Sequence, residues 1–274
     1  MTNIMKKLNT EKIENLPYVQ FMALLDEVNR PPGGKMSVRR SVQNSFISHA
    51  SKVLDIGCNT GFCTFEIAHL TKARVTGIDI NTDMIAASKR YQSKDPLGHL
   101  VDFLVADGMK MPFKNGSFDV AFSGGSTAFI DDKQKAICEY ARVVKPWGFV
   151  VDINFFYHKK PPAALLKEMN ALLGIDIQPW GLKYWTNLYT ACGLEQYYLF
   201  TEKVKLVSKK QVKIYCHAIS QDKKYPSDIE SAIYKRLACT MTLFNKNHSY
   251  LSYGIFISRK RPDKEQVSLF DQQI

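Results

Sequence analysis

The chain has 274 residues, 45% of them hydrophobic, which suits one large domain or a core with additions. No run approaches the roughly 18 apolar residues that a membrane span needs, so a membrane partner is not expected. The formal net charge is +11. Residues 203–264 carry 14 Lys and Arg against 4 Asp and Glu, a net charge of +10, so the other 212 residues are close to neutral at +1.

The first residues and the cysteines point to an intracellular compartment. Lys6 and Lys7 have no apolar segment behind them, so a secretory signal is not expected. The cysteines are scattered and form no Cys-x-x-Cys pair, which favours free thiols in a cytoplasmic protein over disulfides or a metal site. They stand at positions 58, 63, 138, 192, 216 and 239.

Two amphipathic segments open the chain. Residues 17–29 place Tyr18 and Phe21 on one helical face, and residues 37–48 form a second helix. The stretch NRPPGGK between them cannot be helical, because proline and glycine break the helical pattern. We therefore expect an N-terminal helical lid over residues 1–48, with NRPPGG as its hinge. The same apolar face also suits a helix that simply docks on the core.

Short apolar strands alternate with helices from Lys52 onward, which predicts an α/β fold, a mostly parallel sheet with helices on both faces. The expected strands are 53–57, 74–79, 101–105, 118–123, 147–155 and 194–201, with one more near 249–259. The expected helices are 62–71, 82–92, 131–143, 162–173 and 182–191. The core then spans residues 49–202 plus 249–261.

Residues 203–248 interrupt this alternation and are expected to form a basic α+β insertion before the last strand. QVKIYCHAI, residues 211–219, is interpreted as a strand, and residues 227–244 as a helix with an apolar face from Ile229 to Phe244. That face could cover the mouth of a substrate pocket or form a dimer contact. A solvated basic face is the alternative for its lysines.

The segment VLDIGCNTGF, from Val53 to Phe62, joins a core strand to a helix through two glycines. A dinucleotide fingerprint needs glycines at the first, third and sixth positions, where this chain has Gly57, Asn59 and Phe62. A phosphate-binding loop is also absent, because no Gly-Lys-Ser/Thr follows. The turn therefore favours a ligand without phosphates.

In this region the sequence resembles the class I S-adenosylmethionine-dependent methyltransferases of the small-molecule branch. Five ordered motifs carry the resemblance: Asp55, Gly57 and Gly61 in the first turn, Asp79 in GIDIN, Asp107 in VADGMKMPF, then GSFDVAFSGG and RVVKPWGFVV. Asn59 stands where the family often has a third glycine. The resemblance implies a Rossmann-like seven-stranded sheet and S-adenosylmethionine as the cofactor. It covers roughly residues 50–202 and the last strand.

The resemblance also implies which residues hold the cofactor. Asp79 would accept both ribose hydroxyls, and Asp107 the adenine amine, with Gly108 and Met109 beside the ring. Gly57 and Gly61 would bring the backbone close to the amino acid end, while Asp55 would order the turn or accept from the ammonium group. A loop cap is the alternative for any single aspartate. The full expected set is Arg40, Asp55, Gly57, Asn59, Gly61, Asp79, Ile80, Asp107, Gly108, Met109 and Ser123.

The methyl acceptor should bind at the carboxyl ends of the fourth and fifth strands. Asp132 and His158 are the candidate proton acceptors, although Asp132 also suits the first turn of a helix. Methyl transfer is an in-line displacement in which alignment supplies much of the rate, so a general base is optional. Residues expected to touch the acceptor are Tyr18, Phe21, Ser126 and Tyr157.

These features predict methyl transfer to a small molecule or short peptide, as in metabolite or natural-product tailoring. The alternative is an RNA methyltransferase that uses residues 203–264 to bind RNA. Against RNA, the insertion shows no RNA-binding motif. A non-catalytic relative of the family is disfavoured by the presence of both Asp79 and Asp107. A monomer and a homodimer both remain open.

Overall fold

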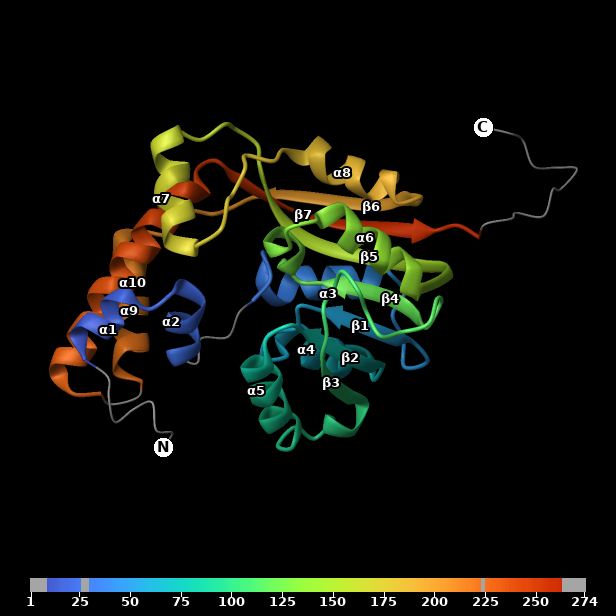
Figure 1. Ribbon diagram of the computed structural model, residues 1–274, viewed down its shortest axis with the longest axis horizontal. Helices are drawn as coiled ribbons and strands as arrows, with labels where there is room; N and C mark the ends of the chain where they lie inside the picture. Colours follow the sequence, from blue (N-terminus) through green and yellow to red (C-terminus); the bar gives the residue numbers. More distant parts are fainter. Residues whose placement is uncertain (1–8, 26–29, 223–224, 263–274) are drawn as a thin grey trace, which may run out of the picture. The chain divides into compact units, whose positions relative to one another are not determined.

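The computed structural model describes residues 9–25, 30–222 and 225–262 (Figure 1). The chain divides into two compact units. Unit 1 comprises residues 1–28, 156–181 and 202–252, and unit 2 comprises residues 29–155, 182–201 and 253–274. Among the helices of the described ranges, none combines the length and apolarity that crossing a membrane requires.

The seven-stranded sheet has the order β3-β2-β1-β4-β5-β7-β6. Neighbouring strands from β3 to β5 run parallel, and the β7–β6 end is antiparallel, which confirms the predicted fold class. The order places β1 and β4 at the centre, so their carboxyl ends lie side by side. The strands are β1 (Lys52–Ile56), β2 (Arg74–Asp79), β3 (Val101–Val105), β4 (Phe118–Ser123), β5 (Val144–Tyr157), β6 (Leu194–Lys203) and β7 (Leu251–Lys260).

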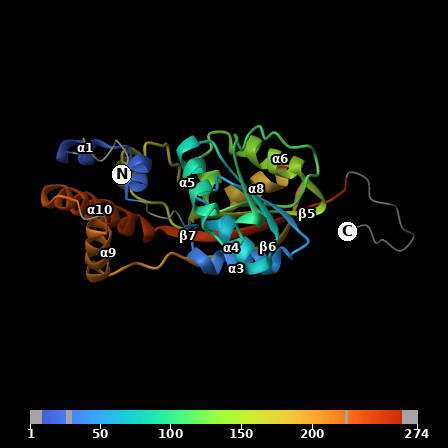
Figure 2. The ribbon, with the colours of Figure 1, turned by 90° about the horizontal axis from the view of Figure 1, so that it is seen from below.

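Helices cover both faces of the sheet, with α3 and α4 on one face and α6 and α8 on the other (Figure 2). Helix α5 packs on β2 and β3. Side chains cap the first turns of two helices. Asn81 caps α5, and Asp132 caps α6 by accepting the N–H of Lys135. The helices of unit 2 are α3 (Gly34–Asn44), α4 (Phe62–Thr71), α5 (Thr82–Gln92), α6 (Lys133–Val143) and α8 (Leu182–Ala191), with short 3-10 turns η2 (Gly98–Leu100) and η3 (Ser126–Phe129).

Unit 1 is a helical body built from three separate stretches of the chain. Its helices are α1 (Thr10–Asn15), α2 (Tyr18–Leu24), α7 (Ala163–Leu173), α9 (Lys209–Gln221) and α10 (Ser227–His248). Ile13 and Phe21 share one buried cluster with Ile229, Ile233 and Leu237 of α10. The first two helices therefore build one core with the insertion, while α3, which follows the prolines, packs on α4 in unit 2.

Arg236 reinforces this core from inside. Its guanidinium lies 4.1 Å from the centroid of the Phe21 ring and donates to the carbonyl oxygens of Ile13 and Leu16. Burial lowers the pKa of this guanidinium. One basic residue of the 203–264 stretch thus serves the packing of α1 and α2 on α10.

The predicted strand at residues 211–219 is wrong, because the segment lies within helix α9. Val212, Cys216 and Ile219 contact the shared core at helical spacing, whereas Ile214 is 59% exposed. A capping box, in which Ser208 and Gln211 bond each other's backbone N–H, begins the helix. That serine-to-glutamine spacing was the signal in the sequence. After the end of β6, the regular elements among the insertion's described residues are the two helices α9 and α10.

Other element boundaries also differ from the predictions, most clearly in α3 and β5. Helix α3 begins at Gly34, inside the segment expected to be non-helical, because Gly33 adopts φ +76° and the Gly34 N–H bonds the Pro31 carbonyl. It ends at Asn44 rather than at residue 48. Strand β5 begins at Val144, three residues before the predicted start. Residues 26–29, the end of the first predicted helix, lie outside the described ranges.

The prediction of free thiols is wrong for one pair. Cys138 of α6 and Cys192, which follows α8, form a disulfide across a sequence separation of 54 residues. Their spacing gives no hint of this, because only the packing of α6 against α8 brings them together. Cys58, Cys63, Cys216 and Cys239 are free.

The shared core of unit 1 can be tested with two isoleucines of opposite burial. Ile233→Ala should lower the free energy of unfolding by about 2–5 kcal/mol, because Ile233 is fully buried between the helices. Ile214→Ala, the control on exposed α9 surface, should change it by no more than about 0.5 kcal/mol. Urea unfolding followed by circular dichroism measures both. Equal effects would contradict the helical assignment of α9.

Candidate active site

In the glycine turn after β1, neighbouring side chains occupy the positions that side chains on the two glycines would take. Gly57 has φ +67°, and a Cβ built on it would lie 2.2 Å from the Cβ of Ser126. Gly61 has φ +96°, and its Cβ would lie 2.8 Å from the rings of Phe65 and Phe103. Asn59 completes the turn at φ +51°. Both glycines are therefore required by backbone conformation and by close packing.

The Asp79 carboxylate ties this turn to the end of β2. Its Oδ2 accepts the N–H of Asn59 at 2.9 Å, and its Oδ1 accepts the N–H of Asn81 at 2.9 Å. A carboxylate offers about four acceptor positions, so two stay available for hydroxyl groups of a ligand. Ile80, the next residue, is 72% exposed and presents an apolar surface at the same place.

Asp55 is buried beneath the turn rather than exposed to a ligand. It is 1% exposed and accepts the hydroxyl of Thr64 at 2.6 Å. Burial raises the pKa of its carboxyl to about 7, against the lowering effect of the Thr64 hydrogen bonds. Of the two roles predicted for it, ordering the turn fits this geometry.

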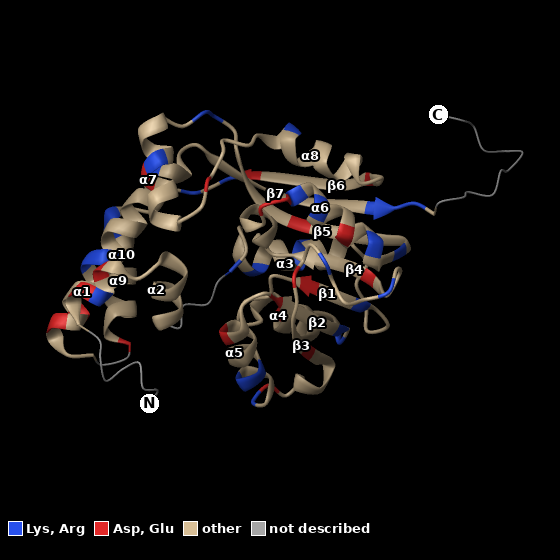
Figure 3. Cartoon of the chain, in the orientation of Figure 1, with Lys and Arg blue, Asp and Glu red and all other residues tan. Residues whose placement is uncertain are grey.

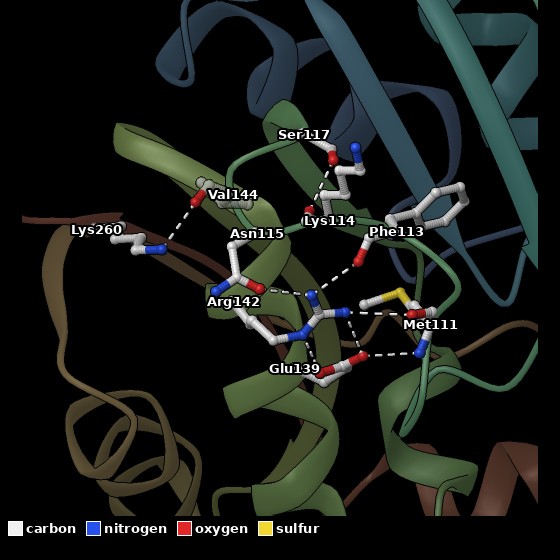
Figure 4. A network of polar contacts seen from close by, with 9 residues as sticks. All are labelled: Met111, Phe113, Lys114, Asn115, Ser117, Glu139, Arg142, Val144 and Lys260. Carbon is white, nitrogen blue, oxygen red and sulfur yellow. Dashed lines mark hydrogen bonds and ion pairs between the residues drawn. The ribbon is translucent and has the colours of Figure 1, made fainter.

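Asp107 follows β3 on a loop that an ion pair holds in place. Asp107 accepts the N–H of Met109 at 2.8 Å. Further along, Arg142 binds Glu139 through two nitrogens at 2.6 and 2.7 Å and also donates to the carbonyl oxygens of Met111 and Phe113 (Figure 4).

Glu139 in turn accepts the Met111 N–H at 2.7 Å, and the Arg142 contacts lower the pKa of its carboxyl. Sequence reasoning missed this anchor, because both residues lie on one predicted helix and nothing along the chain marks the loop as their target. The pair fixes the loop that carries Asp107, Gly108 and Met109.

Three other expected cofactor or acceptor residues have structural partners. Ser123 is fully buried, with its Oγ 3.0 Å from that of Ser126 and 2.9 Å from Thr127 Oγ1. The Arg40 guanidinium lies 3.7 Å from the centroid of the Phe200 ring. Asp132 caps α6. The structure thus shows which groups these three side chains contact within the protein. Their predicted roles in ligand binding stay predictions.

The remaining expected acceptor contacts belong to unit 1. Tyr157 donates to Asn247 Oδ1 at 3.1 Å, and burial raises the pKa of its phenol. His158 Nδ1 lies 3.0 Å from Ser252 Oγ. Phe21 is fully buried in the helical core. Tyr18 packs edge-on against Phe244 and lines a hollow of about 500 Å³ whose wall includes Arg236.

The structure therefore brings together, within unit 2, the glycine turn, Asp79, Ile80, the Asp107 loop and Ser126. Tyr18, Phe21, Tyr157 and His158 lie within unit 1. Within the described ranges, no three His, Cys, Asp or Glu side chains are grouped so that they could hold a metal ion. The groups within unit 2 thus lie at the carboxyl ends of β1 to β4.

Comparisons with known proteins agree with this geometry. Residues 54–152 match the family model described as a methyltransferase domain. An uncharacterized protein of Haemophilus influenzae is 25% identical over 192 residues, which are 69% of this chain and 76% of that protein. The O-methyltransferase rstn1 of Aspergillus nomiae is 36% identical over 132 residues, 47% of this chain and 58% of that enzyme.

The solved structure of the MccD protein has the same fold, with a TM-score of 0.75 and 22% identity, over 85% of this chain and 100% of that chain. Other structural neighbours hold S-adenosylmethionine or its demethylated product. The chain spans between 27% and 58% of the length of the named methyltransferases that it matches. Residues 54–152 of this chain are therefore a methyltransferase domain, and the chain has the Rossmann-like fold of these solved neighbours.

Proposed function

We propose that this chain transfers the methyl group of S-adenosylmethionine to a small molecule or short peptide. The observation that carries the proposal is the edge formed by the glycine turn, Asp79 and the Asp107 loop. Its two carboxylates lie on neighbouring strand ends, as a ligand with a ribose and an adenine requires. Alignment of the acceptor with the methyl group supplies most of the rate. Named relatives include O-methyltransferases and sterol methyltransferases, which supports a small acceptor.

The residues of the site fit the cofactor. Asp79 keeps acceptor positions for the two ribose hydroxyls, and Ile80 offers an apolar surface beside them. Gly57 and Gly61 allow the turn to close tightly, because Ser126 and the rings of Phe65 and Phe103 occupy the positions that their side chains would take. When bound, S-adenosylmethionine supplies an electrophilic methyl group on a positively charged sulfur. The protein supplies orientation and a place that excludes water.

The segment before α3 supports the predicted role of the N-terminus as a lid. A Cβ on Gly124 would lie 3.5 Å from Pro31 Cβ, and one on Gly125 would lie 3.4 Å from Pro32 Cδ. Arg30 to Gly34 therefore lie against the turn that follows β4, beside the proposed site. Asn29, the first residue of the predicted hinge, lies outside the described ranges. Ligand binding at this edge would stabilise the packing of the segment.

The basic stretch supports an acidic acceptor better than an RNA anchor. Arg259 and Arg261 both bind Glu195, at 3.0 and 2.9 Å, and together hold the pKa of that carboxyl down to about 2. Lys and Arg residues of this stretch are divided between α9, α10 and the end of β7, and Figure 3 colours the basic positions blue. Lys209, Lys210 and Lys213 on α9 are exposed and have no ion-pair partner among the described residues.

The proposal is tested by incubating the protein with isotopically labelled S-adenosylmethionine and fractions of a cell extract. Mass spectrometry of the products should find the label in compounds of low molecular mass. Label in RNA alone would favour the alternative activity. Heat-inactivated protein is the control, and label in no fraction despite cofactor binding would contradict the proposal.

Asp79→Ala should weaken binding of S-adenosylhomocysteine, the demethylated product, by about 1–3 kcal/mol. The reason is the loss of hydrogen bonds from ribose hydroxyls to a charged acceptor. Asp83→Ala, which removes an exposed carboxylate four residues away in the first turn of α5, should leave the affinity unchanged. Isothermal titration calorimetry measures both. Equal affinities for the two variants would refute the ribose role of Asp79.

Amide hydrogen exchange in residues 13–45 should slow when S-adenosylhomocysteine is added, because a lid closed over the cofactor opens less often. Mass spectrometry of peptic peptides resolves the change. Peptides from α8, which packs on α6 and shares no core with α1 and α2, serve as the internal control and should exchange at the same rate in both states. If the peptides from 13–45 are equally protected with and without ligand, the lid proposal fails.

Reversing Lys209, Lys210 and Lys213 to Glu should leave affinity for S-adenosylhomocysteine intact and reduce labelling of anionic small molecules, because a cationic surface concentrates anions. The control reverses Lys89, Arg90 and Lys94, three exposed basic residues of unit 2. Labelling assays at low and high salt compare the two. If labelling and its salt dependence are both unchanged, the charge on α9 has no role in substrate recognition.

A further inference from the structure

A chain of hydroxyl groups leads from the glycine turn into the interior of unit 2. Ser126 packs on Gly57 and donates to the Ile56 carbonyl oxygen at 2.6 Å. Its Oγ lies 3.0 Å from the Oγ of Ser123, which lies 2.9 Å from Thr127 Oγ1. Ser126 is partly exposed, whereas Ser123 and Thr127 are fully buried. The chain therefore has one end at the proposed cofactor turn and the other in the core.

At its inner end lies a carboxylate with an unused acceptor position. Asp152 stands opposite Ser123 in the pairing of β4 with β5 and is fully buried. Its Oδ2 accepts the phenol of Tyr189 at 2.9 Å, but its Oδ1 has no hydrogen-bond partner among the described residues. Within the described part of the chain, the fully buried amide of Asn154 also has no hydrogen-bond partner at its nitrogen or its oxygen.

Unpartnered buried polar atoms of this kind lower the stability of the folded protein. A buried polar atom without a partner typically costs about 1–3 kcal/mol, and the cost is higher for a charged group. An apolar residue at position 152 would avoid this cost, but the buried Tyr189 phenol would then lose its acceptor. That phenol uses only one of the two carboxylate oxygens, so the unpartnered Oδ1 and the Asn154 amide are not explained by this contact.

The surroundings of Asp152 leave it able to bind a proton. Burial raises the pKa of its carboxyl to about 6, while the surrounding polar side chains of Tyr189, Thr127, Ser123 and Asn154 hold it from rising further. The titratable groups that face it are Tyr189 from α8 and Tyr140 from α6, both with a raised phenol pKa. From β4 and η3 it meets only neutral hydroxyls. Asp152 is then mostly ionised at pH 7 and ready to accept a proton.

We propose that the hydroxyls of Ser126 and Ser123 connect the methyl acceptor to Asp152, which takes up the proton that the acceptor loses. The inference rests on the proposed methyl transfer and adds a destination for its proton. Asp152 does not touch the acceptor and acts only through the two serines. The acceptor class that needs such a relay is one whose nucleophile still carries a proton when it reacts, such as a hydroxyl or an ammonium group.

The step balances as follows. A lone pair of the acceptor atom forms the bond to the methyl carbon, and the sulfur–carbon bond breaks with its electron pair on sulfur, which becomes a neutral thioether. The acceptor proton passes to Ser126 Oγ, whose own proton turns from the Ile56 carbonyl to Ser123 Oγ. Ser123 passes its proton to Asp152, which becomes a neutral carboxylic acid. No other reactant is needed.

Sinefungin tests the connection without knowledge of the acceptor, because it places an ammonium group where S-adenosylmethionine carries its methyl. Calorimetry at pH 6 in two buffers of different ionisation enthalpy counts the protons released on binding. Wild-type protein should release up to about half a proton more with sinefungin than with S-adenosylhomocysteine, since a group near its pKa is half protonated and a nearby cation favours its charged form.

Three variants test which residues cause the excess proton release. Asp152→Asn should abolish the excess release, and Ser126→Ala should reduce it by at least half. Tyr189→Phe removes one hydrogen bond to the charged carboxylate, so the pH of maximal release should move upward. Tyr189→Phe also keeps the test decisive if Asp152→Asn fails to fold. Retained affinity for S-adenosylhomocysteine reports an intact cofactor site.

Three results would overturn the inference: the same excess release from Asp152→Asn as from wild-type protein, an unchanged excess in Ser126→Ala, or no excess release from wild-type protein. Failure of the wild-type protein to bind S-adenosylhomocysteine at all would instead overturn the proposed function. The two failures are therefore distinguishable.

Discussion

The bonds from Asn59 and Asn81 to the Asp79 carboxylate organise the whole edge of the sheet at which the site lies. Backbone N–H groups in a tight turn need acceptors, and here one charged side chain satisfies two of them from neighbouring strand ends. The same carboxylate is the proposed contact for the ribose. A substitution at this position would therefore disturb the turn and the ligand contact together, which is why Asp83 rather than a turn residue is the proper comparison.

Packing fixes the rest of that edge. Ser126 fills the space above Gly57, and Phe103 with Phe65 fills the space above Gly61. The Glu139–Arg142 pair holds the loop after Asp107 from the other face of the sheet. Three independent restraints thus position groups that are distant in sequence. None of them involves unit 1, so residues of one compact unit hold the edge at which we propose the cofactor binds.

Much of the fold could be predicted because strands β1 to β4 are short, apolar and separated by helices with clear periodicity. The strand prediction for residues 211–219 was wrong because Val212, Ile214 and Cys216 alternate as they would in a strand. The face that packs on the core instead contains Val212, Cys216 and Ile219. The prediction of free thiols was wrong for Cys138 and Cys192, because disulfide partners follow from tertiary packing and not from spacing along the chain. Asp55 could be recognised as part of the turn, but its burial and its Thr64 bond could not. Asp152 and Asn154 were read only as strand residues, because a buried polar cluster leaves no sequence pattern.

The helical unit has a consequence for exchanging substrate preference between related proteins. Its core joins Ile13 and Phe21 from the start of the chain to Ile229 and Ile233 from the insertion, and the polypeptide passes between the two units five times. An insertion moved alone into another member of the family would arrive without the helices that complete its core. The foreign helices would then have to match its apolar surface. Recombination or grafting should succeed only when the first two helices and the insertion travel as a set.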